Sequence, residues 1–476
     1  METREYDVVV IGGGPAGENA AQYAVEGTGM TSAMIERELL GGECSYWACM
    51  PSKALLRPIA VADVTEDLEG VSTAHVAPKA LLERRDHWVS SYDDAGQDTW
   101  ADGAGIAVVR GSGRLVGERT IRVSSSSDGE VEVVARRAVV LATGSEPLVP
   151  EMYADALPWG SRDATGVVEV PDRLVVIGGG VVACEAAIWM SALGSDVTLV
   201  VRDQRLLGRT EPFAGEAVLA GLRRRGITVH LGTDVSDVRR EAPEATGIGR
   251  VHGGMVTLTT STGELEADEL ESDELLLSIG RRPRLDDIGL ISVGVTPDDV
   301  KSGRLPEWLH VVGDASGGPP LTHWGKHQAR VVGARIAAAT AGEVAWEPDR
   351  EAPVPQVVFS DPEVAAVGMT EAEALAAGHD VVVSRVPTSS ASGASLLRDH
   401  VEGDSQIVVD AESRLLLGAT FVGVEAGELV HAATVAIVGG VPVHVLRHAV
   451  ASYPTASELW LRLLEELPRE FRRPPA

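Results

Sequence analysis

The feature that most constrains the fold is a glycine-rich turn that occurs twice, each time between an apolar strand and a helix. In the first copy, the buried-strand pattern of residues 6–11 leads into Gly12-Gly-Gly-Pro-Ala-Gly17 and an alanine-rich helix from Glu18 to about Glu26. Glycines at these positions permit a tight turn and let a pyrophosphate approach the helix N-terminus. A second strand, 31–35, ends at Glu36, where an acid would hold a ribose hydroxyl. The first copy therefore predicts a dinucleotide site.

The second copy of the pattern predicts a second dinucleotide site. Its parts in order are the strand Arg173–Ile177, the turn Gly178–Ala183, the helix Cys184–Leu193 and the strand Asp196–Val201. Cys184 lies inside the helix, where we expect it to be a small buried apolar residue.

The second copy lacks the acid that ends the second strand of the first copy. Val201 stands there and is followed by Arg202. An acid pairs with a free ribose 2′-hydroxyl, whereas an arginine accommodates a 2′-phosphate. The sequence therefore favours NADPH over NADH. The alternative is a solvated arginine, and Arg205 and Arg209 are placed as well as Arg202.

Two of the three cysteines, Cys44 and Cys49, stand five positions apart in the segment 41–53. A straight helix rises about 7.5 Å over five residues, more than the roughly 4.4–6.8 Å between α-carbons that a disulfide tolerates. If the pair bonds, Cys44 must lie in a distorted turn before a helix that carries Cys49, with Pro51 in its first turn. A thiol at a helix N-terminus near Lys53 is expected to have a lowered pKa. Taken alone, the pair fits redox chemistry, a structural staple or two buried thiols.

Composition restricts the class of protein and its partners. The 476 residues suffice for roughly three domains, and 44% hydrophobic with 23% charged residues describe a soluble globular chain. A net charge of −29 argues against nucleic acid and anionic membranes as partners. No apolar run reaches the roughly 18–20 residues that span a membrane, and the N-terminus has no signal-peptide pattern. With few cysteines, we expect a cytoplasmic protein, where disulfides are usually catalytic.

Between the two copies, several turns and strands complete the nucleotide domains. We predict separate strands at 131–134 and 138–141, the latter ending in a turn at Thr143 and Gly144, with a loop at 124–129 before them. An acidic loop is expected at 264–274, and a turn at Gly280 marks the return to the first domain. A strand from His310 ends at Gly313-Asp314, and a helix opening at Leu321 runs to Ala341.

From Glu351 the pattern changes to antiparallel strands and helices without a nucleotide motif. We expect strands at 357–368, 405–410 and 415–422, and helices at 371–377, 425–437 and 457–466. The predicted class is α/β, with two Rossmann-like dinucleotide-binding domains and a C-terminal α+β dimerisation domain. The predicted boundaries are 1–150 for the first domain, 151–278 for the second, 279–349 for the return to the first, and 350–476 for dimerisation.

Together, these motifs resemble the class I pyridine nucleotide–disulfide oxidoreductases, which include dihydrolipoamide dehydrogenase, glutathione reductase, mercuric reductase and soluble transhydrogenase. The resemblance covers essentially the whole chain. It is carried by both glycine turns, the Cys-x4-Cys-x-Pro-Ser-Lys segment, the Ala-Thr-Gly and Gly-Arg-Arg-Pro turns, Gly313-Asp314 and the block 357–363.

The resemblance implies FAD in the first site and a nicotinamide nucleotide in the second, in a homodimer whose active sites borrow residues from the partner. Cys49 would face the flavin, Cys44 would attack the substrate, and Lys53 would lie near the flavin and pair with Glu185. The catalytic candidates are Cys44, Cys49, Lys53, Glu185, Tyr453 and Glu458. The FAD candidates are Gly12, Gly14, Gly17, Glu36, Thr143, Gly144, Gly313 and Asp314, and those for NAD(P) are Gly178, Gly180, Ala183, Arg202 and Gly280. No metal site is expected.

Three departures from the family pattern affect the acceptor end of the site. Glu43 precedes the first cysteine, where threonine is common, and Ser45-Tyr46-Trp47-Ala48 makes the interval bulkier and more aromatic than usual. The largest departure is Tyr453 in Tyr-Pro-Thr-x-x-Glu458, where disulfide reductases of the family carry histidine as the acid–base group. Forming a phenolate at pH 7 costs about 4 kcal/mol, so accepting a proton from a dithiol would be poor.

Three functions follow from these residues. The favoured one is an FAD-dependent NADPH oxidoreductase that passes electrons through a Cys44–Cys49 disulfide to a disulfide or another small acceptor, such as a quinone or metal ion. The second is transhydrogenation between NADPH and NAD with dispensable cysteines. The third is a flavin-bound redox sensor with little turnover.

Overall fold

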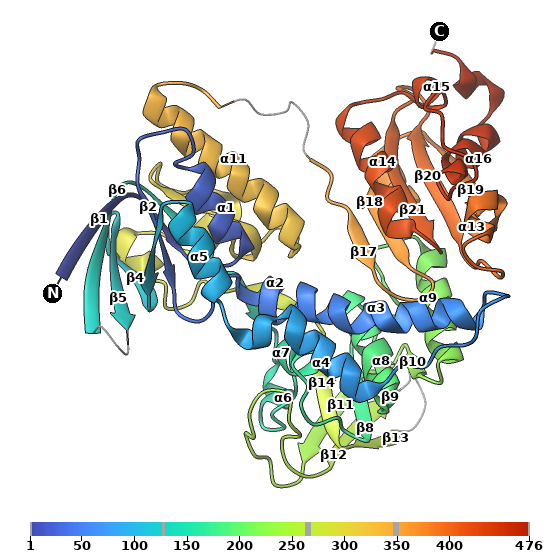
Figure 1. The fold of residues 1–476 in the computed structure, drawn as a ribbon, viewed down its shortest axis with the longest axis horizontal. Coiled ribbons are helices and arrows are strands. Elements are labelled where there is room, and N and C mark those ends of the chain that lie inside the picture. Colours follow the sequence, from blue (N-terminus) through green and yellow to red (C-terminus); the bar gives the residue numbers. More distant parts are fainter. Residues whose placement is uncertain (1, 126–128, 262–267, 346–351, 475–476) are drawn as a thin grey trace. The chain divides into compact units, whose positions relative to one another are not determined.

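The computed structural model describes residues 2–125, 129–261, 268–345 and 352–474. The chain forms two compact units, each assembled from three segments (Figure 1). The first comprises Met1–Pro51, Arg85–Leu148 and Gly280–Pro348; the second comprises Ser52–Arg84, Val149–Ile279 and Asp349–Ala476. The predicted domain boundaries at 150, 278 and 349 stay a prediction.

The first unit is built on a mixed sheet with β1 and β6 at its centre. Its strand order is β3 (Ile106–Arg110), β2 (Ser32–Glu36), β1 (Glu2–Ile11), β6 (Gly129–Leu141), β5 (Thr120–Ser125) and β4 (Ser112–Gly117), with β16 (Leu309–Val311) also on β6. The pairs from β3 to β6 and the pair of β6 with β16 are parallel, whereas β4, β5 and β6 pair antiparallel.

The prediction of two strands at 131–134 and 138–141 is wrong, because β6 is one strand of 13 residues. Its first half pairs with β5, its end pairs with β16, and β1 accompanies both halves. Arg136 and Arg137 interrupt the apolar pattern without interrupting the strand. Of the predicted loop 124–129, residues 126–128 lie outside the described residues and the rest belongs to β5 and β6.

Alternate residues of β1 enter cores on opposite faces of this sheet. Val8 and Val10 pack with helices α1 (Pro15–Tyr23), α5 (Ala95–Gly103) and α11 (Thr322–Ala341). Val9 and Ile11 pack with β4, β5 and the segment around Leu290. Helices α1 and α11 lie side by side (Figure 1), and Gly333 allows the approach, since a Cβ there would lie 2.8 Å from the Tyr23 Cβ.

The cysteine segment forms two helices rather than a turn and a helix. Cys44 lies in the short α2 (Gly42–Tyr46), and Cys49 is the first residue of α3 (Cys49–Glu66). The helix carrying Cys49, with Pro51 in its first turn, agrees with the prediction. The distorted turn was predicted for Cys44 only if the pair bonds; because both thiols are free in this structure, it stays a prediction. The residues that separate the two helices are Trp47 and Ala48.

The nucleotide-binding part of the second unit contains a parallel sheet in the order β10 (Thr228–Leu231), β9 (Asp196–Val201), β8 (Arg173–Ile177) and β14 (Glu274–Leu277). A three-stranded antiparallel sheet, β11 (Asp234–Arg240), β12 (Val256–Ser261) and β13 (Asp268–Ser272), packs on one face. Helices α8 (Val181–Leu193), α9 (Pro212–Arg224), α3 and α4 (Pro78–Trp88) contribute to the core on the other. The acidic loop predicted at 264–274 is wrong from residue 268 onward, where β13 and β14 lie; residues 262–267 lie outside the described residues.

The C-terminal part is an antiparallel sheet in the order β17 (Gln356–Val358), β18 (Val364–Gly368), β21 (Leu416–Val422), β20 (Asp404–Asp410) and β19 (Val381–Pro387). Helices α14 (Ala426–Val438) and α16 (Glu458–Glu466) pack on it (Figure 1). Helix α12 (Glu371–Ala376) contacts β19. The strand predicted at 357–368 is two strands, and β19 was not predicted.

The remaining elements are short. They are α6 (Glu151–Ala154), α7 (Ser161–Thr165), α10 (Pro297–Ser302), α13 (Ser392–Ser395), α15 (Val443–Leu446), β7 (Ser145–Pro147) and β15 (Arg281–Pro283). Among the described residues, no helix is both long and apolar enough to cross a membrane. Within the same ranges, no group of three or more His, Cys, Asp or Glu is placed to hold a metal ion.

Candidate active site

The first glycine turn leaves no room for larger residues at two positions. Gly12 has φ +107°, and a Cβ there would lie 2.3 Å from the carbonyl oxygen of Ala142. A Cβ on Gly17 would lie 1.9 Å from the carbonyl oxygen of Gly12. At Gly14, the N-cap of α1, a Cβ would make an ordinary contact at 3.8 Å with the Gly42 Cα. The tight turn and the helix N-terminus that follows it fit a pyrophosphate.

Glu36 occupies the end of β2, as predicted, and its carboxylate is already oriented. One oxygen accepts a hydrogen bond from the Gly13 N–H at 2.7 Å, and the other accepts one from the Glu38 N–H, also at 2.7 Å. The carboxylate is thereby fixed beside the glycine turn, in the position from which an acid binds ribose hydroxyls.

The other FAD candidates lie together in the first unit. Asp314 accepts a hydrogen bond from the Ser145 hydroxyl at 2.5 Å, and Arg281 Nε donates to the same hydroxyl at 2.7 Å. Gly144 and Gly313 have φ of +73° and +66°, which favour glycine. The Thr143 hydroxyl donates to the backbone of a neighbouring loop. These contacts gather the carboxyl ends of β6 and β16 at one edge of the sheet, which is where ligands bind to sheets of this kind.

The second glycine turn repeats this geometry in the second unit. Gly178 has φ +131°, with a Cβ position 2.3 Å from the carbonyl oxygen of Ser278, and around Gly180 nothing lies within 4 Å of a Cβ. Ala183 is fully buried in α8. Arg202 follows β9 with an exposed side chain, 3.9 Å from the Asp203 carboxylate. Gly280, predicted with this group, belongs to the first unit.

The two cysteines are half-buried free thiols in this structure. The pKa of Cys44 is raised, first by its hydrogen bond with the Cys49 thiol and then by burial, while Thr322 and Lys326 act in the opposite direction. The Cys49 sulfur lies 3.2 Å from the Thr322 hydroxyl at the start of α11. The pair is therefore arranged so that ionising one thiol disfavours ionising the other. A lowered pKa for Cys49 stays a prediction.

Lys53 and Glu185 form an ion pair within the second unit. Lys53 Nζ lies 2.8 and 3.1 Å from the two carboxylate oxygens, and Glu185 is only 3% exposed. The Phe359 N–H donates to the same carboxylate at 3.1 Å, and Lys53 Nζ lies 4.6 Å from the centre of the Phe359 ring. This arrangement fixes a cationic side chain one helical turn after Cys49 in α3.

Tyr453 and Glu458 belong to the C-terminal part of the second unit. Tyr453 is 73% exposed, whereas Glu458 is buried and accepts hydrogen bonds from the Ser392 N–H and the Arg462 guanidinium. Cys184 is fully buried, and burial raises the pKa of its thiol to about 12, as expected for a packed apolar residue.

The sequence reasoning missed three polar residues near the cysteines. They are Thr322, Lys326 and Glu18, the last of which interacts with both Lys326 and Tyr46. Burial raises the pKa of Glu18 to about 7. The helix opening at Leu321 was predicted, but its pairing with the cysteine segment depends on contacts between residues some 270 positions apart, and no local pattern signals these.

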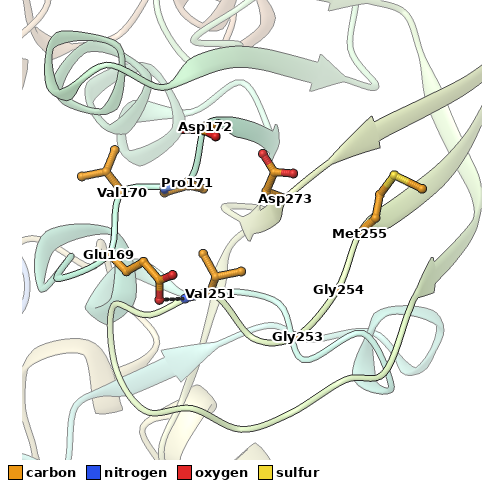
Figure 2. Close-up of a pocket in the computed structure, with 9 residues that line it drawn as sticks. All are labelled: Glu169, Val170, Pro171, Asp172, Val251, Gly253, Gly254, Met255 and Asp273. Atoms are coloured by element: carbon orange, nitrogen blue, oxygen red, sulfur yellow. Dashed lines mark hydrogen bonds between the residues drawn. The ribbon is translucent and has the colours of Figure 1, made fainter.

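A hollow of about 440 Å³ in the second unit holds none of the predicted residues. Its lining is Glu169, Val170, Pro171, Asp172, Val251, Gly253, Gly254, Met255 and Asp273 (Figure 2). The Glu169 carboxylate accepts from the Val251 N–H at 3.3 Å, and the ion pair with Arg173 lowers the pKa of Asp273. The carboxylates of Glu169 and Asp273 are thus engaged in local structure.

Two sequence families match the chain. The family described as pyridine nucleotide-disulphide oxidoreductase matches residues 6–324, and its dimerisation domain matches residues 354–463. Among curated relatives, the dihydrolipoyl dehydrogenase of Haloferax volcanii is 33% identical over 473 residues, covering 96% of this chain and 95% of its own. The mercuric reductase of Staphylococcus aureus is 29% identical, covering 95% of this chain and 81% of its own.

Two solved structures match the fold of this chain over almost its whole length. The HOCl-induced flavoprotein disulfide reductase RclA of Escherichia coli matches with a TM-score of 0.81 and 23% identity, over 97% of this chain and 100% of that one. LpdA of Mycobacterium tuberculosis matches with a TM-score of 0.80 and 23% identity, over 98% and 99% of the two chains. The predicted α/β class with two Rossmann-like domains and a C-terminal dimerisation domain is confirmed.

Proposed function

Because the chain belongs to the pyridine nucleotide–disulphide oxidoreductase family, we propose that it oxidises NADPH and reduces a small acceptor other than lipoamide or glutathione disulfide. The chain is a flavoprotein NAD(P)H-dependent disulfide oxidoreductase with FAD and a nicotinamide cofactor, and its dimerisation domain supports a homodimer. The acceptor, the choice of NADPH and the residue roles that follow are the proposal.

The proposed roles follow from what each side chain contacts. When bound, FAD and the nicotinamide supply hydride transfer, and the Cys44–Cys49 disulfide takes up the two electrons with two protons to become a dithiol. Cys49, beside Thr322, is the inner thiol, and Cys44 is the thiol that meets the acceptor. Lys53 is held in place by the carboxylate of Glu185, which also accepts a hydrogen bond from the Phe359 N–H. The reduced acceptor leaves with the electron pair, and the disulfide reforms.

Tyr453 is the observation that carries the choice of acceptor. A phenol can donate a proton to a reacting group, but it is a poor proton acceptor compared with the imidazole that the family carries here. Oxidation of a dithiol needs a side chain that accepts the thiol proton. Reduction of a quinone, a metal ion or an unusual disulfide depends less on a proton acceptor at this position. We place Tyr453 and Glu458 at the partner's active site, as the family resemblance implies.

NADPH is favoured over NADH by the end of β9. Val201 is buried there and leaves no carboxylate for a ribose 2′-hydroxyl, while Arg202 is exposed beside it. The second candidate, dihydrolipoyl dehydrogenase chemistry with NAD, is favoured by the relatives of that name at 31–33% identity. The two candidates differ in nucleotide and in thiol substrate, so one set of assays separates them.

The central experiment is an anaerobic titration of the purified flavoprotein with NADPH and, separately, with NADH. We expect NADPH to reduce the protein at lower concentration and to produce a long-wavelength thiolate–flavin absorbance band that Cys44→Ser/Cys49→Ser lacks. Reduction by NADH alone, with rapid dihydrolipoamide oxidation, would support the second candidate and contradict the proposal.

Three variants, Tyr453→His, Tyr453→Phe and Cys44→Ser/Cys49→Ser, test which acceptor the enzyme reduces. Tyr453→His should raise turnover of lipoamide or glutathione disulfide about tenfold or more, because general acid–base catalysis contributes about 10²–10⁴-fold. Rapid wild-type turnover of these disulfides, unchanged in Tyr453→Phe, contradicts the proposed role of Tyr453.

Undiminished turnover of the physiological acceptor in the double-serine variant would favour transhydrogenation. Steady NADPH consumption with a small acceptor excludes a sensor with little turnover.

The cytoplasm stays the proposed compartment. It rests on the low cysteine content, three in 476 residues, together with a pair assigned to catalysis rather than to a structural bridge. The domain boundaries of the sequence analysis likewise stay part of the proposal.

A further inference from the structure

The residues between the two cysteines decide whether the thiols can meet. Trp47 ends α2 with φ −131° and ψ −2°, and its N–H donates to the Glu43 carbonyl at 2.8 Å. The next helix begins at Cys49. A continuous helix would separate Cys44 and Cys49 by about 7.5 Å along its axis. The interruption of the helix at Trp47 and Ala48, called the α2–α3 break below, therefore determines how close the two sulfur atoms can come.

The ring of Trp47 is stacked on a residue distant in sequence, Tyr92. The ring centroids lie 4.4 Å apart with 25° between the planes. Both rings are half-buried in the first unit. A stacked aromatic pair is more stable than its buried area alone implies, so this contact opposes rotation of the Trp47 ring and movement of the residues that separate α2 and α3.

Tyr92 ends a segment with an unusual backbone. Ser90, Ser91 and Tyr92 have φ of +49°, +51° and +61°, the left-handed region that residues other than glycine rarely occupy. In this region the Cβ of an L-residue crowds the following carbonyl oxygen, so each such residue is strained. A segment keeps this backbone only where surrounding contacts impose it, and such outliers cluster at functional sites. Here the backbone conformation of residues 90–92 places the Tyr92 ring against the Trp47 ring.

Tyr46 ties the end of α2 to the same region of the chain. Its ring is 2% exposed, and its hydroxyl donates to the Gln97 side chain at 3.1 Å. Burial raises the pKa of Tyr46 to about 12, so the hydroxyl stays a donor at ordinary pH. Two adjacent residues at the α2–α3 break, Tyr46 and Trp47, are thus both in contact with the segment 90–97.

We propose that Trp47 and Tyr92 are positioning residues that hold the turn between Cys44 and Cys49 and so set the stability of their disulfide relative to the dithiol. Neither ring needs to touch a substrate or an electron carrier for this role. Without the stack, the turn samples conformations in which the sulfur atoms are too far apart to bond, and the disulfide becomes easier to reduce. The inference rests on the proposed redox role of the pair, but on no particular acceptor.

The test measures the dithiol–disulfide equilibrium of the holoenzyme directly. Wild type, Trp47→Ala, Tyr92→Ala and the double variant are equilibrated anaerobically in mixtures of reduced and oxidised dithiothreitol, which supply and accept the two electrons and two protons. The fraction of free Cys44 and Cys49 is then counted by alkylation and mass spectrometry. Flavin content and melting temperature are recorded for each variant.

The expected result is that each alanine variant lowers the equilibrium constant for the disulfide about tenfold, a shift of about 30 mV toward easier reduction. Trp47→Phe and Tyr92→Phe, which keep a flat ring, should stay within about twofold of wild type. The double variant should be little worse than either single variant, because both remove the same contact. Should an alanine variant fail to fold, Trp47→Leu and Tyr92→Leu retain apolar volume without the stack.

Two results overturn the proposal in distinguishable ways. If wild type equilibrates but the alanine or leucine variants match it, or if the two single effects simply add, Trp47 and Tyr92 do not position the pair through their stack. If the wild-type thiols stay reduced at every ratio and also fail to form a disulfide with an excess of a stronger thiol oxidant such as diamide, the redox role of the pair fails and the positioning role fails with it.

Discussion

The two glycine turns have nearly the same backbone and different chemistry. The carbonyl oxygen of Gly13 accepts from the Gly41 N–H at 2.8 Å, and that of Gly179 accepts from the Leu207 N–H at 2.8 Å. At the end of the second strand, however, the first turn faces the carboxylate of Glu36 and the second faces the isopropyl group of Val201. The glycine pattern therefore specifies the turn, while one residue more than twenty positions later specifies what the turn can recognise.

The helices that follow the turns differ as well. Gly17 in α1 lies so close to Gly12 that a methyl group would overlap its carbonyl oxygen, whereas α8 carries Ala183 at the matching position. The next residue is Glu18 in α1 and Cys184 in α8. The first turn is thus tighter and is followed by a half-buried acid, whereas the second is looser and is followed by a buried thiol.

The largest effect is expected at the tighter turn. Gly17→Ala places a Cβ 1.9 Å from the Gly12 carbonyl oxygen, and overpacking of this kind costs about 1–3 kcal/mol. We expect FAD binding to weaken about a hundredfold, measured as flavin retained after dialysis against a low FAD concentration. The matched change Ala183→Gly should weaken NADPH binding less than about tenfold, because it adds only flexibility. Equal effects at the two turns would contradict the difference in tightness.

A reciprocal exchange at the ends of the second strands should have an intermediate effect. Glu36→Val removes the acceptor of the Gly13 and Glu38 N–H groups and should weaken FAD binding about tenfold, as one charged hydrogen bond is worth about 1.5–3 kcal/mol. Val201→Glu should move the ratio of NADH to NADPH affinity about tenfold toward NADH. Nucleotide titrations followed by flavin fluorescence measure both changes, and an unchanged ratio would contradict the proposal that Val201 favours NADPH.

The smallest effect concerns the residues that follow the two turns. Burial raises the pKa of Glu18 from 4.5 to about 7, so the folded protein keeps a proton that the unfolded chain has lost. This contribution to stability is present below about pH 4.5 and is lost as the pH rises through about 7. Allowing for partial exposure, the free energy of unfolding should fall by about 1 kcal/mol more in wild type than in Glu18→Gln between pH 5 and 7.5.

Urea unfolding at the two pH values measures this difference. Cys184→Ala is the matched control at the second turn, because burial raises the pKa of the Cys184 thiol to about 12, far above that range, and the variant should keep the wild-type pH dependence. A Glu18→Gln variant with the same pH dependence as wild type would show that another group is responsible.

Sequence patterns predicted the nucleotide motifs well because their signals are local. The strands at 173–177 and 196–201 were predicted with the bounds that β8 and β9 have, since apolar runs and glycines delimit them. Strand β6 was divided wrongly because its two halves face different partners, so its apolar pattern changes along its length. Strand β19 was missed because alternation in Val-Val-Val-Ser-Arg-Val-Pro is weak.

The site was predictable in part for the same reason. The cysteines and Lys53 lie in one continuous segment, and the resemblance assigned Glu185 to Lys53, which the structure places at 2.8 Å. Thr322 and Tyr92 reach the cysteine segment from distant parts of the chain. Their contributions depend on the tertiary fold, and nothing in their neighbouring residues indicates them.

The hydroxyl of Thr322 can keep its contact with Cys49 in more than one protonation state. Because a hydroxyl both donates and accepts, it can receive a hydrogen bond from a thiol and give one to a thiolate across the same 3.2 Å. A backbone N–H could serve only the thiolate, and a carbonyl only the thiol. When Cys49 loses or gains a proton, rotation of the Thr322 hydroxyl about its C–O bond can therefore preserve the contact without a movement of α11.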